Sequence, residues 1–61
     1  MHNTLSQVAR GDARHVLQHL RTHSTCTAGL LEDPACTQAS LAAELDMMLI
    51  ELGALRDRIR T

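Results

Sequence analysis

The 61-residue sequence predicts an all-α fold, an antiparallel two-helix hairpin that a partner protein or self-association into a bundle completes. The first observation is a set of apolar residues in the last third of the chain that recur at alternating spacings of four and three: Leu41, Leu45, Met48, Leu52, Leu55 and Ile59. This rhythm is typical of a helix that packs on another helix. The second observation is Asp33 followed by Pro34 in mid-chain, a pair that favours the start of a helix.

The elements follow in order along a single domain, residues 1–61. Helix one is expected over about residues 4–31, with Thr4 or Asp12 as its N-cap and an apolar face that includes Val16 and Leu20. It is expected to continue through the Thr- and Ser-rich residues 22–27. A turn at 32–34 follows, and helix two is expected over about 34–60.

The chain is short for an independent core. Domains of this size bury only about 60% of their unfolded surface and are marginal alone. The sequence contains no Phe, Tyr or Trp, so the side chains that bury the largest areas are missing. We therefore expect the isolated chain not to be a well-folded monomer at low micromolar concentration.

Helix two carries more apolar surface than one neighbour can cover. Beside the first stripe runs a second one: Ala43, Met47, Ile50 and Ala54. One stripe is expected to close the hairpin and the other to face a partner, and the pattern does not decide which. The predicted partner-binding residues therefore come from both stripes: Leu45, Met47, Met48, Ile50, Leu52, Leu55 and Ile59.

Candidate chemistry is sparse. His15, His19, His23 and Cys26 share a helix ridge and are of the types that bind zinc, but one straight helix cannot enclose a tetrahedral ion, so we expect no metal and no cofactor. Cys26 and Cys36 are expected to stay reduced. No serine lies in a glycine elbow and no glycine-rich phosphate loop is present, so an enzyme is not expected.

The charge pattern bears on partners and location. The net charge is −1 and no aromatic residue is available for base stacking, so we expect no nucleic-acid partner. No apolar run approaches the ~18 residues of a membrane span. The chain starts without the basic and apolar regions of a signal peptide. We therefore expect a cytoplasmic protein that does not bind membranes.

Three features together resemble a known family. They are the Leu-Gln-His-Leu segment at 17–20, the Asp-Pro-Ala-Cys turn at 33–36, and the apolar helix that continues to Leu55. In these features and in its length the chain resembles the small helical-hairpin co-chaperones of type III secretion systems. The resemblance implies a cytoplasmic virulence-associated adaptor that stabilises a helical-repeat chaperone, which together with it holds the needle subunit before export. The apolar face of helix two is the part of the family pattern that carries over.

Two other functions fit the same hairpin. One is a homodimeric four-helix bundle that binds RNA, for which Arg10, Arg14 and Arg21 supply a dilute basic face. The other is a phage-type inhibitor that covers the surface of a host protein. Both alternatives are non-enzymatic, and both depend on association through the apolar side chains of helix two.

Overall fold

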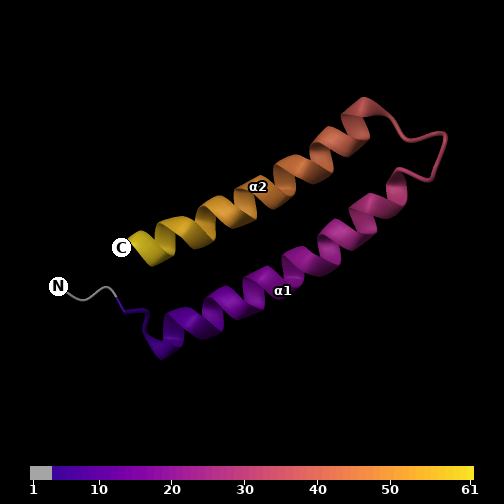
Figure 1. Cartoon of the computed structure of the whole chain (residues 1–61). Helices are drawn as coiled ribbons and strands as arrows, with labels where there is room; N and C mark the ends of the chain where they lie inside the picture. Colours follow the sequence, from indigo (N-terminus) through magenta and orange to yellow (C-terminus); the bar gives the residue numbers. More distant parts are fainter. Residues whose placement is uncertain (1–3) are drawn as a thin grey trace.

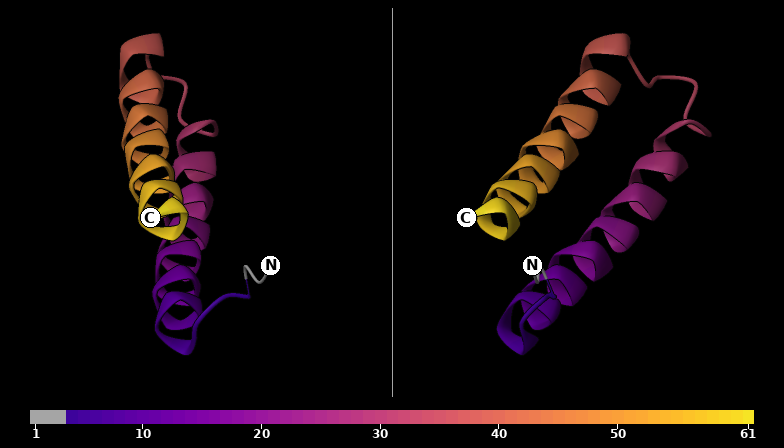
Figure 2. Two further views of the ribbon diagram at one scale, coloured as in Figure 1. Left: turned by 90° about the vertical axis from the view of Figure 1, so that its left-hand side faces the viewer. Right: turned by 60° about the vertical axis from the view of Figure 1, so that its left-hand side comes forward.

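Two antiparallel helices make up the structure, a computed structural model that describes residues 4–61 (Figure 1). They are α1 (Gln7–Leu30) and α2 (Gln38–Arg60). The helices lie side by side in every view, with the start of α1 near the end of α2 (Figure 2). The rod measures 51 × 16 × 14 Å, and its described residues contain no strand. The predicted all-α hairpin is confirmed.

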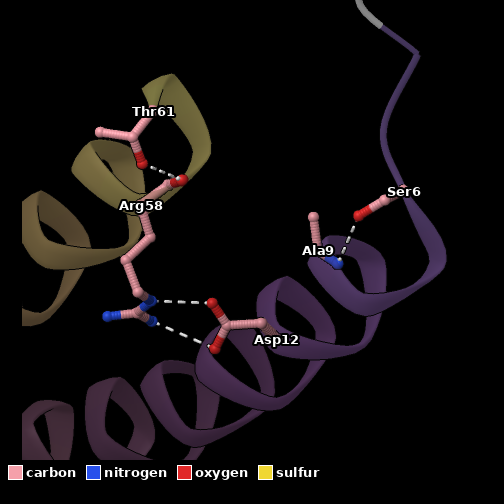
Figure 3. Close-up of polar contacts among 5 residues, drawn as sticks. All are labelled: Ser6, Ala9, Asp12, Arg58 and Thr61. Atoms are coloured by element: carbon pink, nitrogen blue, oxygen red, sulfur yellow. Dashed lines mark hydrogen bonds and ion pairs between the residues drawn. The ribbon is translucent and has the colours of Figure 1, made fainter.

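Ser6 begins α1. Its hydroxyl oxygen accepts a hydrogen bond from the backbone N–H of Ala9 at 3.1 Å, which satisfies a donor that has no partner within the helix (Figure 3). The expected N-caps are therefore wrong: Thr4 lies two residues before the observed cap, and Asp12 lies six residues after it. Thr4 precedes the helix, and Asp12 lies inside it, where its carboxylate is free to contact α2.

The Thr- and Ser-rich segment does not interrupt α1. The hydroxyl of Thr22 donates to the Gln18 carbonyl at 3.3 Å, and those of Ser24 and Thr25 donate to the Arg21 carbonyl at 2.9 and 3.0 Å. Hydroxyls on this segment thus bond back to the preceding turn instead of competing with the helical backbone. The expected continuation of helix one through residues 22–27 is confirmed.

The loop is longer than the expected turn at 32–34, and α2 begins at Gln38 instead of Pro34. The carboxylate of Asp33 accepts the N–H of Ala35 at 2.9 Å, and its carbonyl accepts the N–H of Cys36 at 3.0 Å. Asp33 and Pro34 therefore form a turn, a second common use of this residue pair. Thr37 is the N-cap, because its hydroxyl accepts the N–H of Ser40 at 3.1 Å.

The core is thin and lies along the contact line of the two helices. Val16 and Leu20 of α1 and Leu55 of α2 form its buried cluster, with Ala13 and Met48 packed against it. Thr27 is also buried, and its hydroxyl has no hydrogen-bond partner among the described residues. No side chain among residues 4–61 is completely enclosed, so the hairpin alone leaves most of its apolar side chains in contact with water.

Candidate protein-binding surfaces

Three polar pairs join the helices along one edge of the hairpin. The guanidinium of Arg58 donates to the carboxylate of Asp12 through two nitrogens, at 2.8 and 3.1 Å (Figure 3). A ring nitrogen of His19 lies 2.6 Å from a carboxylate oxygen of Glu51. The third pair joins His23 to Glu44, also at 2.6 Å. We call these six residues the polar edge.

The bidentate contact shifts the acid–base equilibrium of both partners. The hydrogen bond from Arg58 holds the pKa of Asp12 below its ordinary value of 3.8, and the charge of Arg58 acts in the same direction against partial desolvation. The same hydrogen bond raises the pKa of Arg58. Both ions are therefore fully charged near neutral pH, and the pair connects the first turns of α1 to the last turn of α2.

The polar edge sets the rotation of α2 about its own axis. The residues of α2 that face α1 are Leu41, Glu44, Met48, Glu51 and Leu55, which keep the alternating spacing of three and four. Leu45, Leu52 and Ile59 of the first stripe remain exposed. Neither apolar stripe therefore closes the hairpin by itself. Three of the residues that face α1 belong to the first stripe: Leu41, Met48 and Leu55. The other two are glutamates that bond to histidines on α1.

Leucines collect on the edge opposite the polar pairs. Successive residues are about 100° apart around a helix axis, so Leu45, Leu49 and Leu52 lie on the far side of the Met48–Leu55 line from Glu44 and Glu51. On α1 the same rule separates Leu17 from Asp12 and His19. Because the polar pairs define one common edge, the leucines of both helices share the other. We call Leu17, Leu45, Leu49 and Leu52 the leucine face; all four are exposed, Leu49 at 65%.

A second apolar surface lies on the outer side of α2. Met47, Ile50 and Ala54 line an open hollow of about 340 Å³, bordered by Glu51. Ile50 is 73% exposed, the most exposed large apolar residue of α2. We call Met47, Ile50 and Ala54 the methionine face. It corresponds to the second stripe of the sequence, and no part of α1 covers it.

The structure divides the predicted partner-binding residues into two groups. Leu55 is 5% exposed and packs on α1 with Met48, so these two serve the hairpin itself. The other five are exposed and available: Leu45, Met47, Ile50, Leu52 and Ile59. The sequence prediction did not include Leu17 and Leu49. No pattern within one helix identifies them, because the long-range pairs of His19 with Glu51 and His23 with Glu44 decide which edge of the hairpin these leucines share.

The predicted histidine ridge separates into different roles. His19 and His23 contact glutamates, and their rings lie 6.3 Å apart between centroids. His15 and Cys26 are exposed, and Cys26 and Cys36 are free thiols. Within residues 4–61 no three His, Cys, Asp or Glu side chains come together as a metal site. The absence of a metal requirement stays a prediction.

Comparison with known proteins adds no relative. The chain matches no family model, no curated protein and no solved structure. Neither helix of the described chain is both long and apolar enough to cross a lipid bilayer. The features that bear on function are the two exposed apolar surfaces and the charges beside them.

Proposed function

We propose that this chain is a non-enzymatic adaptor that binds another protein through the exposed apolar surface of α2. One observation carries the proposal. The hairpin buries a single large apolar residue of α2, Leu55, and leaves six exposed: Leu45, Met47, Leu49, Ile50, Leu52 and Ile59. Clusters of exposed apolar side chains such as the leucine and methionine faces mark sites of protein association. Methionine suits such a site because its unbranched side chain repacks easily against different neighbours.

The finer proposal names the partner class. The resemblance to type III secretion co-chaperones implies a helical-repeat chaperone as the direct partner and a needle subunit as the protein that the pair keeps from assembling early. The two-helix hairpin is compatible with this role, since the role requires an apolar ridge and no catalytic group. The chain is then expected to act in the cytoplasm, where the needle subunit is held before export.

Self-association is the second candidate, and the exposed leucines of both helices, though not the charges beside them, support it. This face draws residues from both helices, so a second hairpin could pack on it to form a four-helix bundle. Such a dimer would bury Leu17 together with Leu49. It would also account for the marginal core of the single hairpin, because small domains are commonly stabilised by oligomerisation.

The test is co-purification of the full chain from its native host with three matched variants. Ile50→Asp places a charge on the methionine face, Leu49→Asp places one on the leucine face, and Gln18→Asp places one on the exposed outer side of α1. We expect the partner to be lost from at least one α2 variant and retained by Gln18→Asp, since a desolvated charge is costly in an apolar interface.

Two measurements complete the experiment. Circular dichroism shows that each variant keeps its helices, and mass spectrometry identifies what co-purifies. A helical-repeat chaperone in the complex would support the finer proposal, whereas an unrelated partner would contradict it. Retention of every partner and of the oligomeric state in both α2 variants would refute the adaptor proposal.

A further inference from the structure

A row of arginines runs beside the leucine face. Arg10, Arg14, Leu17 and Arg21 follow each other on α1 at spacings of four, three and four, so they form one ridge of the helix. All three arginines are exposed. On the opposite border, Arg56 follows Leu52 by four residues, but its guanidinium is already paired with Asp57 at 3.1 Å, so the free positive charge beside this face comes from α1.

The arginines of α1 are not neutralised within the hairpin. Arg10, Arg14 and Arg21 make no ion pair within residues 4–61. Asp12 is the one acidic residue of α1, and it lies on the polar edge with Arg58. Glu44 and Glu51 are also on that edge and contact histidines. The acids of the helix contact therefore gather on one edge of the hairpin, and the unpaired arginines of α1 border the other.

We propose that the leucine face binds an acidic amphipathic helix of a partner protein. This inference depends on the proposed adaptor function and adds the site and the chemistry of the partner. One ridge from each helix contributes to this face, and the apolar side of a third helix can pack across two such neighbouring ridges. Apolar residues of the partner would cover Leu17, Leu45, Leu49 and Leu52, and its carboxylates would lie against the arginine row.

The two kinds of contact contribute differently. Burial of leucine side chains supplies affinity, since the gain is roughly proportional to the apolar area removed from water. Ion pairs at an exposed border add little affinity, but they select the partner and speed its association. The leucine face therefore explains why a partner binds, and the arginine row explains which helices it accepts.

The same charges disfavour the other occupants. A second copy bound through a two-fold axis would present the same surface, so its arginine row would approach leucines already bordered by arginines. RNA would match the arginines but not the four exposed leucines, and the chain has no aromatic side chain for bases to stack on. An acidic helix matches both the leucines and the arginines.

The test uses two synthetic helical peptides that share one leucine pattern, with leucines at i, i+3, i+4 and i+7. One carries glutamates beside the leucines and the other carries lysines at the same positions. Both are used at concentrations where sedimentation shows them monomeric. Binding to the full chain is measured by calorimetry, and a short RNA duplex is titrated in parallel. The variants are Leu49→Asp, the matched Ile50→Asp, and a triple variant with Arg10→Glu, Arg14→Glu and Arg21→Glu, each checked for helicity.

The glutamate peptide is expected to bind about tenfold tighter than the lysine peptide at low salt, with the advantage decreasing as salt is added. Leu49→Asp should abolish this binding, Ile50→Asp should preserve it, and the triple variant should prefer the lysine peptide. Equal affinity for both peptides, no binding of either, or tighter binding of the RNA would overturn the proposal. So would a dimer of the chain that Leu49→Asp dissociates.

The result separates this inference from the adaptor function. If the native partner is lost from Ile50→Asp and retained by Leu49→Asp, the partner binds the methionine face, so the leucine-face proposal is wrong and the adaptor function stands. If both variants retain the partner, the adaptor function itself is wrong.

Discussion

The two helices are nearly equal in length but bury different shares of their apolar side chains. α1 has 24 residues and buries Val16, Leu20 and Thr27 against its neighbour. α2 has 23 residues and buries Leu55 alone, although it is the more apolar helix in sequence. α1 buries two of its five large apolar residues and exposes two, Val8 and Leu17, whereas α2 buries one and leaves six exposed.

This difference indicates which helix the hairpin serves. α1 supplies a core-facing stripe, the histidines and Asp12 of the polar edge, and a hydroxyl-rich outer surface. It therefore holds α2 in one orientation. α2 in turn exposes apolar residues on both sides of the contact line, so it is the helix with surface left for further neighbours. Four predictions test this division.

The largest expected effect is on stability at the contact line. Leu55→Ala removes the most buried side chain of α2 and should lower the free energy of unfolding by about 2–5 kcal/mol. Leu49→Ala is the matched change on an exposed site and should alter it by roughly 0.5 kcal/mol or less. Urea denaturation followed by circular dichroism measures both, at a chain concentration high enough for the hairpin to be folded. Equal losses would show that α2 is not oriented as the polar edge requires.

The next effect concerns the buried hydroxyl of α1. Thr27→Val replaces a hydroxyl that has no partner among the described residues by a methyl of similar size. The free energy of unfolding should rise by about 1 kcal/mol, because a buried unsatisfied polar group is costly. Thr25→Val, at an exposed site on the same helix, is the control and should give no such gain. A loss of stability in Thr27→Val would mean that this hydroxyl does bond.

A smaller effect should distinguish the two histidine pairs. The side chain of His23 is 15% exposed and that of His19 is 60% exposed. Double-mutant cycles to alanine should therefore give a coupling of up to about 1 kcal/mol for His23 with Glu44, and only a few tenths for His19 with Glu51. A larger coupling energy for His19 with Glu51 than for His23 with Glu44 would contradict the expectation that the more buried pair contributes more.

The smallest effect is a pH dependence at the open end of the hairpin. Because Arg58 lowers the pKa of Asp12 from 3.8, this contact stabilises the fold above pH 3.8 and is lost as the pH falls through the lowered value. The urea midpoints of the wild type and Asp12→Asn should therefore differ at neutral pH and converge in acid. Asp46→Asn, at an exposed carboxylate of α2, is the control and should show no convergence of this kind.

Local patterns in the sequence were sufficient for the fold. The all-α hairpin followed from the spacing of apolar residues in the last third of the chain and from the Asp33–Pro34 pair, which lies in the turn although it does not start α2. Both are short-range signals, because helical periodicity and turn chemistry act over a few residues. The cap positions were harder to predict from the sequence, because other residues that can cap a helix lie close to Ser6 and Thr37. Only the path of the backbone decides which of them becomes the cap.

The rotation of α2 was decided by the tertiary structure. In sequence, Leu45 and Leu52 are better candidates for the contact line than Glu44 and Glu51, because apolar residues normally face a neighbouring helix. The structure places the glutamates there because His19 and His23 lie opposite them, 32 and 21 residues away along the chain. A one-helix pattern contains no information about such distant partners. The apolar spacing therefore determined that α2 packs on a helix, and the pairing between helices determined which of its leucines remain exposed.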